Sequence, residues 1–331
     1  MNDEGRGEGD AGGPGGEQAA TRRPGGGRAA AWRWVAALLS RRRVYLPLLL
    51  VPPLLWFGVV YVGSLVALLV QSFYRVDEFS GAVVEEPSLA TYRAMFGSPA
   101  HLDIIGRTVA MAVAVTIACA IVAFPVAYYA ARYARGRLRA LFYLAVMTPL
   151  WASYLVKVYA WRLLLAREGI VTWFFESLGL GGALEALLAL PVVGGPSLSA
   201  SHLGTFLVFT YMWLPFMILP TQAALERVPP PLLEASADLG ARPLTTFRRV
   251  VFPLALPGVI AGSVFTFSLT LGDYIIPGLV GSPGFFLGMM VYQQQGTAGN
   301  VPLAAAFSTV PVVLVAAYLT FAKKTGALDA L

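Results

Sequence analysis

The sequence is poor in charged residues and in cysteine, and both shortages restrict what the chain can be. Only 13% of its 331 residues are charged and 57% are hydrophobic, whereas about 25% are charged in typical soluble domains. So few ionic groups could not cover a water-soluble fold of this length, which argues against a soluble enzyme or a nucleic-acid-binding protein. Cys119 is the single cysteine, so an internal disulfide and a multi-cysteine metal site are excluded.

Histidine and lysine are also scarce. His101 and His202 lie alone, without a second ligand at metal-binding spacing, and we expect no metal site. A phosphate-binding loop of the Gly-x-x-x-x-Gly-Lys-Ser/Thr type is absent, and none of the three lysines follows such a glycine run: Lys157, Lys323 and Lys324. We therefore expect that the chain binds no cofactor and that any ATP is hydrolysed by another subunit.

Long apolar runs take the place of charge. A membrane-spanning helix needs about 20 apolar residues, because only an internally hydrogen-bonded backbone is tolerated in hydrocarbon. Six runs meet this requirement and predict an all-α polytopic membrane protein with six transmembrane helices: Tyr45–Val70, Thr108–Ala131, Ala140–Trp161, Leu203–Leu225, Leu256–Val280 and Val301–Ala322. A seventh run, Leu178–Val193, is too short and is interrupted by Glu185 and Pro191. We expect it to form a helix at the interface or outside the bilayer.

Basic residues near the ends of these runs predict the orientation of the chain. Arginine and lysine collect on the cytoplasmic side of membrane proteins. One side holds fifteen of them, against five on the other, and the fifteen are Arg28, Arg33, Arg41, Arg42, Arg43, Arg132, Arg135, Arg137, Arg139, Arg227, Arg242, Arg248, Arg249, Lys323 and Lys324. Both termini are therefore predicted to be cytoplasmic.

The first 43 residues differ in composition from the rest. Their beginning is rich in Gly, Ala, Pro, Glu and Arg, and such a segment cannot bury enough apolar surface to offset its ordering entropy. We predict a disordered, basic and glycine-rich cytoplasmic tail over 1–43, followed by a six-span domain over 44–331. The first apolar run begins too late and is too long for a signal peptide, so we expect an uncleaved anchor.

The predicted cytoplasmic loop over 226–256 is longer and more apolar than an ordinary linker. Three consecutive prolines, Pro229 to Pro231, precede a short predicted helix over Leu232–Leu239. Gly240 follows where the chain must reverse with a positive φ. A second helical turn is predicted around Thr245–Val250, before the fifth apolar run. This loop is predicted to be a compact helical projection that offers apolar and charged surface to another molecule.

The same loop resembles a motif of ATP-binding-cassette (ABC) importer permeases, the E-A-A loop. The motif runs Glu-Ala-Ala, three residues, Gly, nine residues, Ile, one residue, Leu-Pro. It is matched at the required spacing by Glu234, Ala235, Ser236, Gly240, Val250, Phe252 and Pro253. Ser236, Val250 and Phe252 depart from the consensus but keep its size or apolar character. In that family the loop is a coupling helix that docks on a separate ATPase subunit.

Three further stretches resemble one branch of the family, the first permease subunit of spermidine/putrescine-type importers: Pro149–Val171, Tyr211–Val228 and Ser268–Gly281. The resemblance implies a type I importer permease fold in a bacterial cytoplasmic membrane. It also implies partners: an ATPase dimer that binds ATP and magnesium, a second six-span permease and an extracytoplasmic solute-binding protein. Polyamines are the expected cargo, and relatives in this branch also move ferric iron, aminoethylphosphonate or opines.

Asp273 is the sole acid within a predicted span, and such an acid usually faces a bundle interior or a water-filled cavity. Gly258, Gly262, Thr266 and Thr270 share its helix face. We expect the two glycines to permit close helix packing. Thr266, Thr270, Asp273 and Tyr274 are the candidates for a substrate pathway, with Asp273 and Tyr274 suited to an ammonium group. Alternatively, Gly272 and Asp273 break the helix, and the carboxylate caps the segment after the break.

Lys157 lies near the outer membrane edge among Trp151, Tyr154 and Tyr159. A snorkelling lysine in an aromatic belt accounts for this pattern, and an ion pair with Asp273 is the alternative. The sequence as a whole predicts alternating access without chemistry on the cargo. An intramembrane enzyme lacks its catalytic pair here, and a stand-alone channel or secondary carrier needs no loop for an ATPase.

Overall fold

The computed structural model describes residues 42–324 except 78, 192 and 283, so the predicted tail lies almost wholly outside the described residues. The chain divides into two compact units, 1–65 and 66–331. In the first unit α2 (Arg42–Trp56) continues into the π-helical η1 (Phe57–Val62), and α3 (Gly63–Gln71) follows and enters the second unit. The widened turns of η1 come soon after Pro52 and Pro53, whose rings clash with the preceding turn of a regular helix.

Five described helices are long and apolar enough to cross a membrane, and a bent pair makes up to six. The five are Leu49–Gln71, Pro99–Arg132, His202–Glu226, Pro243–Gly272 and Val301–Lys324. The first, second, fourth and sixth predicted spans therefore each correspond to a helix of sufficient length. The third predicted span is broken into two helices, and the fifth corresponds to a long helix whose bounds differ from the predicted ones.

The third predicted span is two helices rather than one. α6 (Gly136–Trp151) and α7 (Tyr154–Leu164) meet at an angle of 96°. Between them Ala152 is extended, with φ −72° and ψ 143°. Pro149, which lacks an N–H group, lies in the last turn of α6 and weakens the helix there. The apolar run Ala140–Trp161 predicted where this segment lies, but the two helices extend beyond it at both ends, and apolar composition gave no sign of the bend.

The fifth predicted span begins earlier and ends sooner than expected. α12 (Pro243–Thr246), the π-helical η3 (Phe247–Val251) and α13 (Phe252–Gly272) form one span. The helical turn predicted around Thr245–Val250 is therefore the beginning of this span, not a separate element. Asp273 is extended and ends α13, and the short α14 (Ile275–Leu279) follows.

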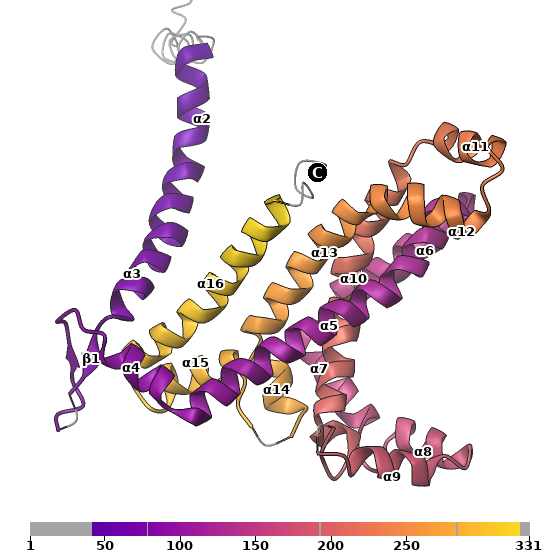
Figure 1. The fold of residues 1–331 in the computed structure, drawn as a ribbon. Helices are drawn as coiled ribbons and strands as arrows, with labels where there is room; N and C mark the ends of the chain where they lie inside the picture. The colour runs from indigo at the N-terminus through magenta and orange to yellow at the C-terminus, as the bar shows by residue number, and fades with distance from the viewer. Residues whose placement is uncertain (1–41, 78, 192, 283, 325–331) are drawn as a thin grey trace, which may run out of the picture. The chain divides into compact units, whose positions relative to one another are not determined.

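The core of the second unit is formed by α5 (Pro99–Arg132), α10 (His202–Glu226) and α13, which pack on one another (Figure 1). α5 buries one stripe at intervals of three or four residues, the spacing of a single helix face: Ile104, Thr108, Ala112, Val115, Cys119, Ala123, Ala127 and Ala130. α10 is the most buried span, with half of its membrane window inside the protein.

The glycines of α13 allow the close contact with α10. A Cβ added at Gly262 would lie 2.8 Å from the sulfur of Met217, and one at Gly258 would overlap the carbonyl oxygen of Pro220 and the Cβ of Ala224. No side chain larger than hydrogen fits there without a shift of backbone. The predicted small-residue contact is confirmed.

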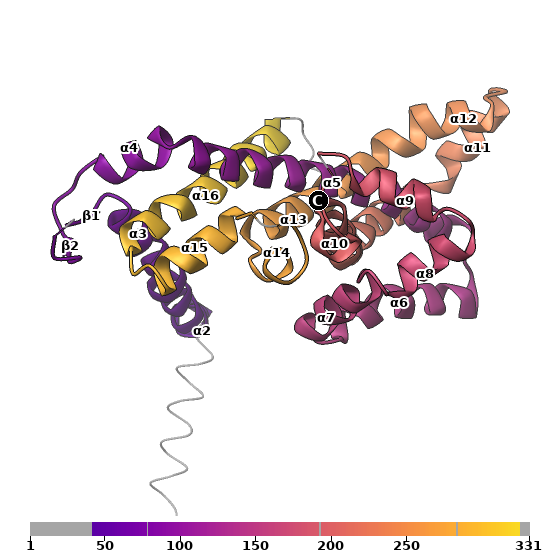
Figure 2. The ribbon, with the colours of Figure 1, turned by 90° about the horizontal axis from the view of Figure 1, so that it is seen from below.

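α16 (Val301–Lys324) is a long helix that packs beside α13. The shorter elements lie mostly at one end of the core helices. They are β1 (Arg75–Val76), its antiparallel partner β2 (Val83–Val84), α4 (Ala90–Gly97), α8 (Ile170–Ser177), α9 (Gly181–Leu188), η2 (Leu198–Ala200) and α15 (Leu287–Gly296). At eight residues, α9 is too short to span, as predicted for the seventh run. Figures 1 and 2 show α8, α9, α14 and α15 at this end, hereafter the α14 end. α11 (Pro230–Asp238) and α12 lie at the opposite end, hereafter the α11 end.

Candidate functional site

α11 is the short helix that the loop sequence predicts, with nearly the predicted bounds. Pro229 is extended and precedes it, and Pro230 and Pro231 occupy its first turn. Gly240 has φ +73°, and its N–H group donates to the Ala237 carbonyl oxygen at 2.8 Å. The chain therefore reverses through a left-handed glycine, as predicted.

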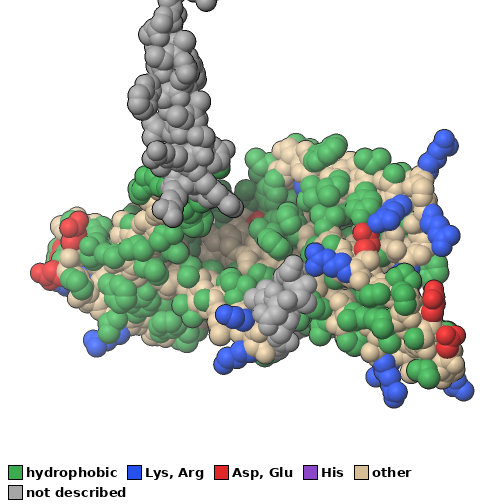
Figure 3. Space-filling model, turned by 90° about the horizontal axis from the view of Figure 1, so that it is seen from above, with side chains coloured by type: hydrophobic (Ala, Val, Ile, Leu, Met, Phe, Trp, Pro, Cys, Tyr) green, Lys and Arg blue, Asp and Glu red, His purple; other side chains and the backbone are tan. Residues whose placement is uncertain are grey.

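The surface of this projection is apolar and basic. The side chains of Leu239 and Leu244 are 87% and 68% exposed, and the motif residues Glu234 and Ala235 are also exposed. A hollow of about 480 Å³ beside them is lined by Leu244, Thr245, Arg248 and Arg249. Figure 3, seen from the α11 end, shows several basic side chains among apolar ones on this face. Leucines this exposed beside basic groups form a surface suited to contact with another protein.

Two sets of contacts attach the projection to the core. The hydroxyls of Ser236 and Thr246 share a hydrogen bond of 2.8 Å between α11 and α12. The ring of Phe247 then packs edge-to-face on Phe124 and Tyr128 of α5, with centroid distances of 5.5 and 6.0 Å. A movement of α11 would thus be transmitted to α5 as well as along α13. Sequence reasoning missed Phe247, because only the fold brings it to α5.

A second attachment surrounds Glu226, the last residue of α10. Its Oε1 accepts hydrogen bonds from Arg139 Nη2 at 2.8 Å, Tyr143 Oη at 2.9 Å and Gln222 Nε2 at 3.0 Å. Arg132 Nη2 donates to the Val228 carbonyl oxygen at 3.1 Å. The start of the projection is therefore bonded to the ends of α5 and α6.

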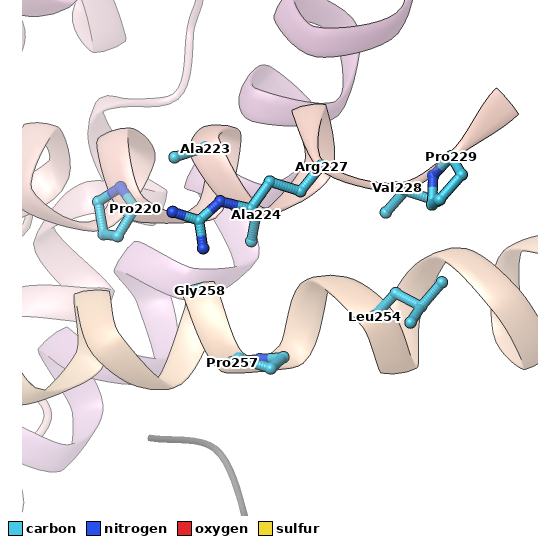
Figure 4. A pocket seen from close by; sticks show the side chains of 9 residues that line it. All are labelled: Pro220, Ala223, Ala224, Arg227, Val228, Pro229, Leu254, Pro257 and Gly258. Atoms are coloured by element: carbon cyan, nitrogen blue, oxygen red, sulfur yellow. The ribbon is translucent and has the colours of Figure 1, made fainter. Parts of the chain in front are cut away.

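A hollow of about 260 Å³ lies between the end of α10 and the beginning of α13 (Figure 4). Its lining includes Ala223 and Ala224 of α10 and Leu254, Pro257 and Gly258 of α13. Figure 4 shows the side chain of Arg227 reaching back along this hollow toward Pro220. The hollow adjoins Val228 and Pro229, which lead into α11.

The other predicted site residues lie at the α14 end, where Asp273 does cap a helix. Its Oδ1 accepts a hydrogen bond from the Ile276 N–H group at 2.8 Å, and its Oδ2 accepts one from the Tyr154 hydroxyl. Lys157 does not pair with Asp273 as the alternative supposed. Its Nζ donates to the Pro149 carbonyl oxygen at 2.7 Å and so satisfies a carbonyl group that the break leaves free.

The remaining pathway candidates separate into buried and exposed residues. Thr266 and Thr270 are 0% and 1% exposed, and Thr270 donates to the Thr266 carbonyl oxygen at 2.7 Å. Both are buried among the described helices, whereas Tyr274 is exposed, and their place in a pathway stays a prediction. Tyr274 is 42% exposed and stacks on Tyr292 at 4.8 Å between centroids. The described residues contain no group of three or more His, Cys, Asp or Glu side chains placed to hold a metal ion.

Comparison with known protein families shows which family the chain belongs to. Residues 123–323 match the model of the family described as the binding-protein-dependent transport system inner membrane component. The chain belongs to this family. It is 61% identical over 309 residues to the inner membrane ABC transporter permease protein YdcU of Escherichia coli, covering 93% of this chain and 97% of that protein. The chain is thus an ABC importer permease subunit, a multi-pass protein of the inner membrane.

More distant relatives agree with this assignment. The spermidine/putrescine transport system permease protein PotB of Escherichia coli is 29% identical over 54% of this chain and 62% of its own length. The permease fold resembles a chain in the crystal structure of a bacterial ABC transporter involved in the import of alginate. That match has a TM-score of 0.66 and 15% identity, and it covers 89% of this chain and 98% of the other.

Proposed function

We propose that this permease uses α11 as its docking helix for an ABC ATPase dimer and that the α11 end is cytoplasmic. The observation that carries this proposal is the projection itself: α11 begins at a proline and is followed by Gly240, and two largely exposed leucines lie directly after α11 (Leu239) and in α12 (Leu244). The match of Glu234 and Gly240 to the E-A-A spacing supports it. Both termini of the chain are then cytoplasmic, in agreement with the distribution of basic residues.

The proposed machine contains four further subunits. Two ATPases bind ATP and magnesium, and a second six-span permease completes the transmembrane pathway. An extracytoplasmic solute-binding protein delivers the cargo at the α14 end. A bacterial alginate ABC transporter, which this chain resembles in fold, was solved in complex with its alginate pentasaccharide-bound periplasmic protein. This chain supplies no ATPase site of its own.

Transport proceeds by alternating access. Closure of the ATPase dimer moves α11, and the bonds of Ser236 and the rings around Phe247 carry that motion into α5 and α13. The two states differ in free energy only by the contacts that change between them. ATP binding therefore biases the pathway by clamping α11, and hydrolysis releases it.

The proposed cargo is a polyamine. Support comes from the PotB relatives at 28–29% identity and from the polar joint around Asp273 at the α14 end. A phosphonate is the second candidate, because the putative 2-aminoethylphosphonate permease PhnU of Salmonella paratyphi A is 34% identical over 43% of this chain. Both cargoes carry an ammonium group.

Uptake by the reconstituted transporter tests both parts of this proposal. The permease is co-expressed with its ATPase, second permease and binding protein, and proteoliposomes are offered radiolabelled putrescine, spermidine, 2-aminoethylphosphonate or ferric iron. ATP-dependent accumulation of a polyamine is the expected result. Accumulation of iron alone would contradict the cargo. Failure of the ATPase to co-purify with the permease would contradict the docking.

A further inference from the structure

Two interrupted helices meet at the α14 end. The break between α6 and α7 lies at Ala152–Ser153, and the break between α13 and α14 lies at Asp273–Tyr274. α7 packs against α14, so the two breaks are neighbours although they are far apart in the sequence. In transporters, interrupted membrane helices are used to place polar groups at cargo sites.

The two carboxylate oxygens of Asp273 have different partners. Oδ1 accepts the Ile276 N–H group and so begins α14. Oδ2 accepts the Tyr154 hydroxyl at the first residue of α7. Among the described residues, Asp273 forms no ion pair. Oδ2 can therefore change its partner while Oδ1 continues to cap the helix.

Tyr154 can also release this bond without leaving its place. Its ring stacks on Trp213 of α10, with centroids 6.1 Å apart and planes inclined by 21°. Because the ring is held by packing, the hydroxyl hydrogen can turn away while the side chain stays where it is. Lys157, one turn further along α7, is bonded to Pro149 and does not compete for the carboxylate.

A hollow beside this joint could hold the rest of a cargo molecule. It measures about 330 Å³ and is lined by ten residues: Leu271, Gly272, Tyr274, Leu287, Gly288, Val291, Tyr292, Gln295, Ser308 and Pro311. Gly272 and Tyr274, the two neighbours of Asp273 in the chain, line this hollow, so its wall includes the same helix break that carries the carboxylate. The apolar lining suits methylene groups, and the exposed faces of the stacked tyrosines suit a cation.

We propose that Oδ2 of Asp273 is an exchange site, at which an ammonium group of the cargo replaces the Tyr154 hydroxyl. This inference rests on the proposed function, an importer of an amine. The Tyr154 phenol is a neutral donor, whereas an ammonium group adds a full positive charge beside a carboxylate that has no ion pair among the described residues, so the ammonium group is the preferred partner of Oδ2. The exchange breaks the bond between α7 and α14, and cargo binding thereby loosens the joint between the two interrupted helices.

The test is putrescine uptake by the complete reconstituted transporter, with spermidine as second probe, for Tyr154→Phe, Asp273→Asn and the control Tyr159→Phe. Tyr159 lies on the same helix and is 50% exposed. Tyr154→Phe removes the competing hydroxyl and keeps the ring. We expect the half-saturating concentration of loaded binding protein to fall about three- to tenfold, and cargo-independent ATP hydrolysis to rise.

Asp273→Asn has the opposite expected effect. An asparagine oxygen can still accept the Ile276 N–H group, but it carries no charge for an ammonium group, so uptake should fall by at least about tenfold. A lower half-saturating concentration in Tyr154→Phe cannot result from misfolding, because misfolding would only reduce uptake. Equal losses in both variants, or no change in either, would overturn the exchange and leave the polyamine importer standing. If the wild-type transporter accumulates neither putrescine nor spermidine, both the exchange at Asp273 and the proposed import of polyamines are overturned.

Discussion

The two ends of the permease differ in the kind of contact that holds their helices and in the residues that they expose. At the α11 end an exposed helix is attached by a hydroxyl pair and aromatic rings, and Leu239 and Leu244 next to it are largely exposed. At the α14 end two interrupted helices are joined through polar bonds of Asp273 and Lys157. Exposed apolar surface suits a partner that remains bound, whereas exchangeable hydrogen bonds suit a ligand that passes. This difference fits the proposed function, in which the α11 end contacts the ATPase and the α14 end contacts the cargo.

The largest expected effect concerns the α10–α13 contact on which both ends depend. Gly258→Leu places a side chain against the Pro220 carbonyl oxygen and Ala224, and overpacking of this kind costs about 1–3 kcal/mol or more. We expect lower thermal stability of the purified complex and loss of uptake. Gly106→Leu is the control, because a Cβ at Gly106 meets nothing within 4 Å. Equal stability of the two variants would contradict the described packing.

Gly240→Val should impair the α11 end alone. A left-handed residue with a branched side chain costs about 1–2 kcal/mol, and Gly240 has φ +73° with open space around it. Uptake is expected to fall at least tenfold while the amount of protein in the membrane stays normal. Gly299→Val imposes the same strain at φ +67° on the α14 side and should leave ATPase binding intact. Normal transport by Gly240→Val would remove α11 from the mechanism.

Phe247→Leu should weaken the connection between α11 and α5. Each aromatic pair contributes about 0.5–1.5 kcal/mol beyond its buried area, and Phe247 packs on Phe124 and Tyr128. We expect ATP hydrolysis to continue while uptake per ATP falls several-fold. Phe124→Leu should lower uptake per ATP by a similar factor. The double variant should lose less uptake per ATP than the two single losses combined. Strictly additive losses would show that the rings act independently.

The smallest effect is expected for Ser236→Ala. This change removes the 2.8 Å hydrogen bond to Thr246, whose net value is about 0.5–1.5 kcal/mol because water replaces it. Uptake should fall about twofold, and Ser236→Thr should restore it by supplying another hydroxyl. A loss as large as that of Gly240→Val would mean that the hydroxyl has a role beyond attachment.

The sequence was informative wherever a local rule decides the structure. Proline at the start of α11 and glycine at its end act through neighbouring residues, and the lengths of apolar runs predict spans. The break between α6 and α7, and its contact with the break at Asp273, could not be predicted from the sequence. Tyr154 and Asp273 are 119 positions apart, and nothing near either residue reveals the other. Thr266 and Thr270 are predicted to line a pathway because they share a helix face with Asp273; both are buried in this structure, and that role stays a prediction.

Photo-crosslinking in the active transporter tests the central claim most directly, that α11 docks on the ATPase. A benzophenone amino acid at position 239 replaces a leucine that is 87% exposed at the α11 end, and one at position 180 replaces a leucine that is 45% exposed near α9. The account predicts that the probe at 239 is linked to the ATPase subunit and that the probe at 180 is not. An active complex in which position 239 is never linked to the ATPase, or in which position 180 is, would contradict it.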